Sequence, residues 1–388
     1  MNAYPVTDAV TYVGADDPDL ALFEGQHPVR PIGVSYNSYV ITDQKIAVMD
    51  TVDARVTEAW LENLDYALDG RTPDYLIISH MEPDHAGSID AFAQAYPTTK
   101  IVSSAKAFVM MQQFFGTDYA DRRIVVKEGD TLPLGHHTLH FVTAPMVHWP
   151  EVIMTYDDAD KVLFSADAFG KFGALDVEEE WLPEARRYFI GIVGKYGVQV
   201  QAVLKKAAGL DIETICSLHG PILHKEQLAD VLAAYDTWSA YRPETDGILV
   251  AYTSIYGHTA DAAEQLAEEL RTKGQQVVVM DLARCDMAEA VAQAFRFSKL
   301  VLATPTYNGD VFPFTKTFIE HLTERNYQNR TVALMENGSW APTAARVMRK
   351  MFEASKNLTI LDETVTVKGS LDDASTAQLH ALADALSK

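Results

Sequence analysis

The sequence has very few cysteines, and its apolar runs are short. Cys216 and Cys285 are the only cysteines among 388 residues, which excludes a disulfide framework and a metal cage built of thiolates. No apolar stretch reaches the ~18 residues that a membrane-spanning helix needs. Residues 1–5 lack the basic segment and following apolar run that mark a signal peptide. We therefore expect a cytoplasmic protein that does not enter a membrane.

Positive charge is scarce as well. The 32 Lys and Arg residues are outnumbered by 54 Asp and Glu residues, which gives a formal net charge of −22. Such a charge repels nucleic acids and anionic membrane surfaces, so we expect neither as a partner. The length predicts two or three domains, each with its own hydrophobic core.

A turn at residues 80–85 concentrates side chains that bind metals. It reads His-Met-Glu-Pro-Asp-His and follows an apolar run at 75–79 that predicts a buried strand. Pro83 stiffens the turn, and the strand would hold it at the rim of a sheet. Four potential ligands in one short turn are hard to explain as a solvated loop. We interpret the turn as part of a metal site.

Three later strands each lead to another nitrogen or carboxylate donor. A lone His or Asp in such a place is more often a capping or core residue, but the repetition argues for one shared rim. The resulting set is too large for one tetrahedral ion and suits two metal ions that share a carboxylate. Because no sulfur ligand is present, the set fits iron, manganese or zinc. The strands are expected at 138–143, 162–165 and 214–218, and the donors are His80, Glu82, Asp84, His85, His148, Asp167 and His219.

The remaining histidines near these segments are not needed to complete the site. His136 and His137 lie in a Gly-His-His turn, where we expect both to be exposed. His140 alternates with apolar neighbours on a predicted strand, and His224 lies just past His219.

The pattern changes after a polar hinge at 242–247. An apolar strand at 248–252 runs into a hydroxyl-rich turn at 253–259, and apolar residues at helical spacing follow. Backbone amides at a helix start and Ser or Thr hydroxyls can bind a phosphate group. The turn has no lysine and no G-x-G-x-x-G pattern, so it is not an ATP-type loop, and a dinucleotide is disfavoured. An ordinary strand–helix turn with a Ser or Thr cap is the alternative.

Two more apolar strands, at 299–303 and 331–335, also end in polar loops. Their alternation with helices predicts five strand–helix units and an open parallel sheet. Ligands of such sheets bind beyond the carboxyl ends of the strands, where three loops would converge. Tyr307 and Trp340 would then flank a flat ring. The helices are expected at 287–297, 313–325, 341–356 and 372–387.

The 80–85 turn, His148, Asp167 and His219 resemble the metallo-β-lactamase-fold domain of the flavodiiron proteins. Zinc hydrolases of that fold have a second His where this chain has Glu82, and the carboxylate makes the site harder and favours iron. The resemblance implies a metallo-β-lactamase-like αββα sandwich at 1–245. It also implies a flavodoxin-like, doubly wound parallel sheet at 246–388.

By this resemblance, two iron ions would bind in the first domain, with Asp167 as the bridge. One ion would take His80, Glu82 and His148; the other would take Asp84, His85 and His219. The role of His85 differs between relatives, because some of them do not use the matching residue as a ligand. Trp149 would keep the pocket apolar, and His27 would either support a ligand or lie at the surface.

The second domain is similar to flavodoxin, and its implied cofactor is FMN. The similarity rests on Thr253-x-x-x-Gly257-x-Thr259 and on Pro305-Thr306-Tyr307-Asn308, whereas the third loop departs from the Gly-Trp order of that family. The implied FMN contacts are Thr253, Ser254, Ile255, Tyr256, Gly257, His258, Thr259, Pro305, Thr306, Tyr307, Asn308, Gly309, Asn337, Gly338, Ser339 and Trp340.

The implied activity is reduction of dioxygen to water, of nitric oxide to nitrous oxide, or of both. No Cys-x-x-Cys pair is present, so electrons should come from a separate donor such as rubredoxin or a reduced deazaflavin. In the family, a head-to-tail homodimer brings FMN of one subunit to the irons of the other, and we expect such a dimer or a dimer of dimers. Rubredoxins are acidic, so docking needs a local basic patch, for which Arg186-Arg187 and Lys205-Lys206 are candidates.

Two other functions stay open. One is a zinc hydrolase of the same fold with a flavodoxin-like redox or docking domain, which Glu82 argues against. The other is an electron carrier with a structural metal site, which the open, ligand-rich site argues against. Dioxygen and nitric oxide are both small diatomic gases, and the sequence does not rank them.

Overall fold

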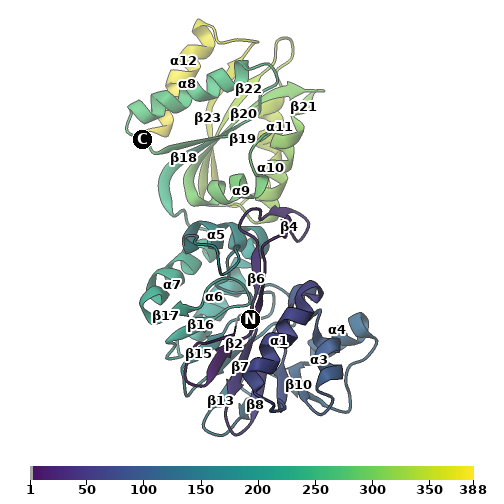
Figure 1. The fold of residues 1–388 in the computed structure, drawn as a ribbon. Helices are drawn as coiled ribbons and strands as arrows, with labels where there is room; N and C mark the ends of the chain where they lie inside the picture. Colours follow the sequence, from purple (N-terminus) through teal and green to yellow (C-terminus); the bar gives the residue numbers. More distant parts are fainter. Residues whose placement is uncertain (1–2) are drawn as a thin grey trace. The chain divides into compact units, whose positions relative to one another are not determined.

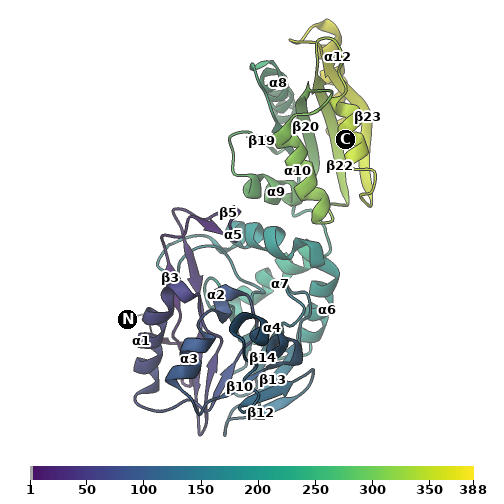
Figure 2. The same ribbon diagram turned by 90° about the vertical axis from the view of Figure 1, so that its right-hand side faces the viewer.

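The computed structural model describes residues 3–388. Its contacts divide the chain into two compact units, Met1–Asp236 and Thr237–Lys388, and the division falls inside helix α7 (Lys225–Ser239) (Figures 1 and 2). The domain boundary expected after residue 245 stays a prediction. Within residues 3–388, no helix is both long enough and apolar enough to cross a bilayer.

The first unit contains two sheets stacked face to face. In the first sheet β8, β9, β10 and β11 run parallel, and β1, β2 and β7 extend it with antiparallel pairs. The second sheet is antiparallel except where β15 pairs with β16. The first sheet comprises β1 (Tyr4–Pro5), β2 (Val10–Tyr12), β7 (Tyr39–Thr42), β8 (Ile46–Met49), β9 (Tyr75–Ile77), β10 (Lys100–Ser104) and β11 (Arg123–Val126). The second comprises β12 (Thr131–Pro133), β13 (Thr138–Thr143), β14 (Ile153–Asp157), β15 (Val162–Phe164), β16 (Thr214–Cys216) and β17 (Leu223–His224).

Helices lie on both outer sides of this pair of sheets. Figures 1 and 2 both place α1 and α3 on one side and α6 and α7 on the other, so the predicted αββα sandwich is confirmed. Two short ribbons, β3 (Ala15–Asp17) with β6 (Val34–Tyr36) and β4 (Leu22–Phe23) with β5 (His27–Pro28), lie outside the sheets. The helices are η1 (Ala54–Val56), α1 (Thr57–Leu68), α2 (Pro83–Ala86), α3 (Ile89–Ala95), α4 (Ala105–Phe115), α5 (Trp181–Tyr188), η2 (Phe189–Val193), η3 (Gly194–Tyr196), α6 (Gly197–Ala207) and α7.

The period-2 alternation of the strands explains why the first sheet is buried on both faces. Val40 and Val48 pack with Trp60 of α1 on one face. Ile41 and Met49 point the other way and pack with strands of the second sheet. The metal-ligand turn therefore starts from a rigid, fully buried strand, β9, as the sequence predicts.

Between β6 and β7 the chain leaves strand pairing at Asn37 and Ser38. The Asn37 amide donates to the carbonyls of Ser217 (2.9 Å) and Gly220 (2.8 Å), and the Ser38 hydroxyl donates to the Asp50 carbonyl (3.0 Å). These buried side-chain bonds replace strand pairing at the break. They also fasten the β16 loop to the first sheet, beside the candidate metal centre.

The second unit is an open parallel sheet with the strand order β19-β18-β20-β22-β23. This order confirms the flavodoxin-like doubly wound sheet and places its switch point between β18 and β20. α8 and α12 cover one face, and α9, α10 and α11 cover the other (Figure 1). The elements are β18 (Thr245–Tyr252), α8 (His258–Thr272), β19 (Val277–Asp281), α9 (Met287–Arg296), β20 (Phe297–Tyr307), β21 (Asp310–Val311), α10 (Pro313–Glu324), β22 (Arg330–Asn337), α11 (Ala344–Met351), β23 (Leu358–Val367) and α12 (Asp373–Leu386).

Candidate metal centre and cofactor pocket

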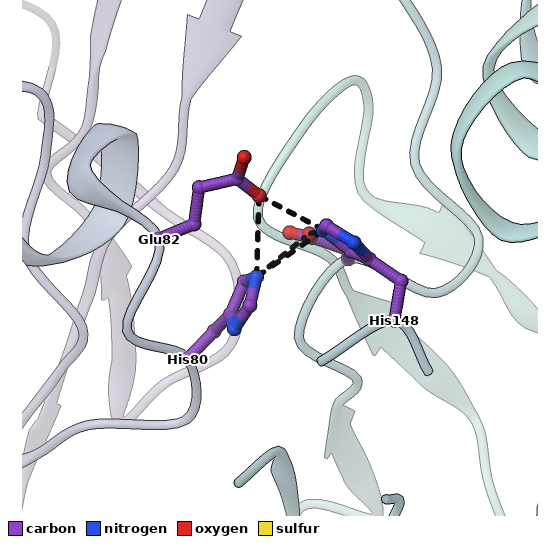
Figure 3. Close-up of side chains that lie close together, drawn as sticks. His80, Glu82 and His148 are labelled. Carbon is purple, nitrogen blue, oxygen red and sulfur yellow. Dashed lines mark hydrogen bonds and ion pairs between the residues drawn. The ribbon is translucent and has the colours of Figure 1, made fainter. Parts of the chain in front are cut away.

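Four of the predicted ligands form one tight donor group in the first unit. His148 Nε2 lies 2.9 Å from Glu82 Oε2 and 2.9 Å from Asp167 Oδ2. His80 Nε2 lies 3.2 Å from His148 Nε2 and 3.3 Å from Glu82 Oε2. Figure 3 shows the side chains of His80, Glu82 and His148 pointing toward one another. The loops after β9, β13 and β15 therefore deliver their donors to one point.

The other three predicted ligands form a second group. His85 Nε2 lies 3.0 Å from His219 Nε2 and 3.4 Å from Asp84 Oδ2, and His219 Nε2 lies 3.3 Å from Asp84 Oδ2. Asp167 joins the two groups, because its Oδ1 is 3.1 Å from His85 Nε2 while its Oδ2 faces the first group. All seven predicted donors are thus brought together, and His85 is among them.

Burial and the close approach of carboxylates and imidazoles together set the pKa values at the site. Burial alone would raise the pKa of Asp167, but the imidazoles of His80, His85 and His148 hold it well below its ordinary value. Burial would lower the pKa of His148, yet Asp167 and Glu82 raise it to about 9. The carboxylates and imidazoles thus each favour the charged form of the other, and metal ions bound between them would supply the positive charge that the carboxylates require.

The donor set fits metal ions better than it fits a hydrogen-bond network. In each group two imidazole Nε2 atoms face each other at 3.0–3.2 Å, where a proton on both would clash. Among residues 3–388, the buried carboxylate oxygens of Asp84 and Asp167 accept no hydrogen bond of good geometry. Buried charges of this kind are normally paired or bound to a metal.

Two of the ligand imidazoles are held in place by hydrogen bonds at their Nδ1 atoms. His80 Nδ1 lies 2.7 Å from Glu151 Oε1, which also accepts the backbone N–H of Met81 at 2.9 Å. His219 Nδ1 donates to the Ser35 carbonyl at 2.7 Å. Such bonds fix the tautomer that leaves Nε2 free to bind a metal. Both Glu151 and Ser35 escaped the sequence analysis, because nothing local marks them as partners of a histidine.

Glu151 provides a test of this support. We expect Glu151→Ala to weaken metal binding about 10–100-fold, because both bonds to its Oε1 are lost. Glu151→Gln keeps an acceptor oxygen in place and should lose much less. Competition with a chromophoric chelator measures the affinity, and Glu58→Gln, an exposed carboxylate on α1, is the control. Metal affinity unchanged in Glu151→Ala would contradict the supporting role.

The loops that carry the ligands adopt rare backbone conformations. Met146, Ala166 and Phe169 have φ angles of 65°, 52° and 70°, a region that residues other than glycine seldom occupy. Asp50, which accepts the Ser79 N–H at 2.6 Å just before His80, has a φ of 56°. Such strained conformations cluster at functional sites, where the surrounding structure offsets their free-energy cost and a side chain is placed precisely.

Two more side chains at the site were missed by the sequence analysis. Glu24, between β4 and β5, lies against Glu82; burial and then the Glu82 charge raise the pKa of Glu24 to about 7. The Tyr188 hydroxyl is fully buried and has no hydrogen-bond partner among residues 3–388. After burial, the charges of Asp167 and Asp84 raise the pKa of Tyr188 most, which places its hydroxyl near both donor groups. Neither residue belongs to a motif, so only the fold reveals them.

The two flanking residues expected at the site are both near it. The Trp149 ring lies 5.2 Å from the His80 ring, almost perpendicular to it, and 6.0 Å from the His148 ring. His27 is only 3% exposed, so the surface alternative is wrong. Its Nε2 lies 3.8 Å from Glu24 Oε2, and its ring lies 5.6 Å from that of Phe172.

Two predictions outside the site are also wrong. His137 is buried instead of exposed, because its Nδ1 bonds to Asp157 Oδ2 at 2.8 Å and its backbone N–H bonds to Asp43 at 2.8 Å. Arg186 and Arg187 are buried and cannot form a surface patch. Arg187 donates to Glu184 at 2.8 Å, because Glu184 lies one helical turn before it in α5. Arg187 also donates to the Pro28 carbonyl at 2.7 Å.

In the second unit, the loops after β18, β20 and β22 surround a cavity of about 730 Å³. Its size suits a cofactor, and no Asp or Glu lines it although the chain is strongly acidic. The N-terminus of α8 and the Ser254 and Thr259 side chains offer donors to a phosphate group. The lining residues are Ser254, Ile255, Tyr256, His258, Thr259, Pro305, Thr306, Tyr307, Asn308, Gly309, Asn337, Gly338, Ser339, Trp340, Ala341, Thr343 and Gly369.

Thr253 and Gly257 are the predicted contacts that do not line this cavity. The Thr253 hydroxyl is buried and lies 2.8 Å from the Thr304 hydroxyl and 2.9 Å from the Thr315 hydroxyl. It therefore ties two strand ends to α10 beneath the cavity. Gly257 has a φ of 99° and forms the turn that starts α8.

Asn337 holds the walls of the cavity together. Its amide donates to the Gly369 carbonyl at 2.9 Å and to Thr259 Oγ1 at 3.3 Å, and it accepts the Gly369 N–H at 3.0 Å. The loops after β22 and β23 and the start of α8 are thereby fixed relative to each other. Ala341, Thr343 and Gly369 were not predicted, because they lie beyond the strand ends that the sequence identifies.

Known proteins with the same arrangement cover nearly the whole chain. Residues 34–220 match the ODP family β-lactamase model, and residues 250–379 match the flavodoxin model. The rubredoxin-oxygen oxidoreductase of Megalodesulfovibrio gigas is 28% identical over 90% of this chain and 88% of its own. The anaerobic nitric oxide reductase flavorubredoxin of Aeromonas hydrophila is 28% identical over 92% of this chain and 74% of its own. The solved structure of rubredoxin oxygen:oxidoreductase from Desulfovibrio gigas has a TM-score of 0.92 at 27% identity and covers 100% of this chain and 98% of its own. This chain therefore combines the metallo-β-lactamase-like and flavodoxin domains of the flavodiiron proteins, and its named relatives of this kind are oxidoreductases.

Proposed function

We propose that this protein reduces a diatomic gas, dioxygen to water or nitric oxide to nitrous oxide, at a pair of iron ions in the first unit. The observation that carries the proposal is Asp167, whose two oxygens face two separate groups of imidazole and carboxylate donors. Relatives named as an oxygen oxidoreductase and as a nitric oxide reductase support this choice of substrates.

The cofactors of the family are FMN and a non-haem diiron pair. The residues that would hold the irons are His80, Glu82, His148 and Asp167 on one side and Asp84, His85, His219 and Asp167 on the other. When bound, the two irons and the flavin supply a binding place for the gas and up to four electrons, the number that reduction of dioxygen to two waters needs. The cavity of the second unit would hold FMN.

The side chains around the donor groups exclude water and supply a proton donor. The buried Phe23 ring lies 5.2 Å from His219 and 5.4 Å from Phe172, and Trp149 closes the side next to His80. An apolar wall of this kind strengthens every electrostatic interaction inside it. The Tyr188 hydroxyl, which has no partner among residues 3–388, is a neutral O–H group that would donate to the reduced gas.

Tyr188→Phe tests that role. We expect gas reduction to fall about tenfold or more, since loss of one positioned donor typically costs more than this. Iron and FMN content should stay at the wild-type level, because the hydroxyl bonds to no ligand. Tyr235→Phe is the matched control, as its buried hydroxyl accepts the Phe169 N–H at 2.5 Å instead of lying free. Equal rates in Tyr188→Phe and the wild type would exclude a donor role for Tyr188.

A separate donor would deliver the electrons, either a rubredoxin or a reduced deazaflavin, and the name of one relative favours a rubredoxin. A head-to-tail homodimer, or a dimer of such dimers, remains our prediction for the assembly. Light scattering tests it: a fully active monomer would contradict the dimer.

The choice between gases calls for steady-state rates with dioxygen and with nitric oxide at the same rate of electron supply. An oxygen electrode and a nitric oxide electrode report the two reactions on the same preparation. A rate well above the unloaded-protein background with at least one gas supports the proposal. Background rates with both gases, from protein that holds iron and FMN, would contradict it.

A further inference from the structure

Helix α11 starts at the wall of the FMN cavity. Thr306 and Thr343 both line the cavity, and Thr306 Oγ1 accepts the backbone N–H groups of Thr343 (3.0 Å) and Ala344 (3.2 Å). Glu336 Oε2 accepts the next one, from Ala345, at 2.9 Å. These bonds fix the start of α11 against the ends of β20 and β22. The helix then runs beside β21 and α10 (Figure 1).

The outer face of α11 is basic. Ala344, Ala345 and Met348 are buried, so the helical period leaves Arg346 and Lys350, four residues apart, exposed on one face. No Asp or Glu occurs from Asn337 to Phe352. Within the described residues 3–388, neither Arg346 nor Lys350 forms an ion pair. Arg349, which is less exposed, donates to the Leu361 carbonyl instead.

Unpaired cations stand out on this protein, because its net charge is −22. The other basic candidates are weaker. Arg186 and Arg187 are buried, and Lys206 is 2.8 Å from Glu128. Lys316, near α11, is paired with Asp310 at 2.8 Å. Exposed lysines without an ion pair among the described residues also occur elsewhere, at Lys106, Lys127 and Lys205 of the first unit and at Lys356 and Lys368 of the second. Arg346 and Lys350 differ from these in lying together on one face of a helix that starts at the cavity.

Apolar side chains are exposed beside the same cavity. The large hydrophobic residues exposed in the second unit are Ile255, Tyr256, Tyr307, Phe314 and Trp340. All but Phe314 line the cavity, and the Phe314 ring lies 6.0 Å from Phe312, which contacts Tyr307. Trp340 is 93% exposed and lies four residues before α11. Exposed apolar contacts with charges at their edge are the usual composition of a protein-docking surface.

We propose that the exposed face of α11, formed by Arg346 and Lys350 and bordered by Trp340, docks a small acidic protein that carries one electron. The proposal rests on the proposed function. It specifies the charge of the electron donor and the surface of this chain to which the donor binds. Each docking oxidises one carrier by one electron, so two dockings supply the two electrons that, with protons from water, reduce one flavin. Opposite charges steer the carrier to the cavity and away from the acidic remainder of the surface.

The test compares two double variants of the holoprotein that change the net charge equally. Arg346→Glu with Lys350→Glu reverses the proposed surface, and Lys106→Glu with Lys127→Glu reverses two exposed lysines of the first unit. The probe is reduced rubredoxin. Calorimetry at low ionic strength measures its affinity, and anaerobic stopped flow measures the rate of flavin bleaching. We expect both to fall about tenfold or more in the α11 variant only, and the difference to shrink in high salt.

Three results would overturn the proposal. The first is an unchanged affinity and bleaching rate in the α11 variant. The second is an equal slowing when a small uncharged reductant replaces rubredoxin, since that would mean damage to the cavity. The third is loss of the oligomeric mass of the wild type in light scattering, since the face would then meet a second copy of the chain. Protein purified without FMN would instead contradict the proposed function, whatever the binding curves show.

Discussion

Asp167→Asn is expected to remove both metal ions and abolish gas reduction. Asp167 is the residue that faces both donor groups, with Oδ2 2.9 Å from His148 and Oδ1 3.1 Å from His85. Asparagine has nearly the same shape but is neutral, and its NH₂ group would face one of the two groups. Loss of residues behind a ligand already costs about 10–100-fold, so loss of a shared ligand should cost at least about a hundredfold in activity. Metal content and gas consumption are the two readouts.

Asp157→Asn is the matched control for this variant. Asp157 is just as buried in the same unit, but it bonds to His137 at 2.8 Å, in a cluster with His137 and Asp160 that is separate from the seven predicted donors. We expect this control to retain its metal ions and activity, although it should lose stability because the buried His137 keeps a weaker partner. Thermal unfolding of both variants separates misfolding from metal loss. Two irons per chain in folded Asp167→Asn would rule out the shared-ligand arrangement.

Glu82→His is expected to exchange iron for zinc. Glu82 Oε2 lies 2.9 Å from His148 Nε2, within the first donor group. A histidine at position 82 would give the turn the His-x-His-x-Asp-His order of the zinc hydrolases of this fold. The change removes one negative charge and one hard oxygen donor, and imidazole sets favour zinc over iron. From cells grown with both metals, we expect the iron-to-zinc ratio to fall about tenfold or more, with gas reduction falling in parallel.

The control for Glu82→His is Glu24→Gln, which removes a neighbouring carboxyl group without changing the donor set. It should keep iron and most of the activity. Iron retained in Glu82→His at the wild-type ratio would show that the second carboxylate of the turn does not select the metal.

Most of the donor set was predictable because each donor follows a strand. His80, His148, Asp167 and His219 come just after β9, β13, β15 and β16, and strands of packed sheets bring their ends to a shared rim. Their spacing along the chain carries no distance, so the predicted division into two groups came from the family resemblance, and the fold supplies the distances. Glu24, Glu151 and Tyr188 could not be predicted, because their contacts join segments far apart in the sequence.

The errors have a local physical cause. His137 was expected to be exposed because Gly-His-His is typical of a turn, but hydrogen bonds to Asp157 and Asp43 hold it in a buried position. Thr253 was expected at the cofactor because it starts the turn motif, yet its hydroxyl points toward Thr304 and Thr315. Whether a residue at a strand end faces a cavity or the core depends on one step of register, which a motif does not reveal.

The measurement that tests the account most directly is the metal and flavin content of the purified chain. Plasma mass spectrometry counts the metals, and fluorescence of released flavin counts the cofactor. We expect about two irons and one FMN per chain, because the seven predicted donors form two groups that share Asp167, and the second unit holds a cavity of cofactor size. Zinc in place of iron, in protein from cells grown with ample iron, would contradict it.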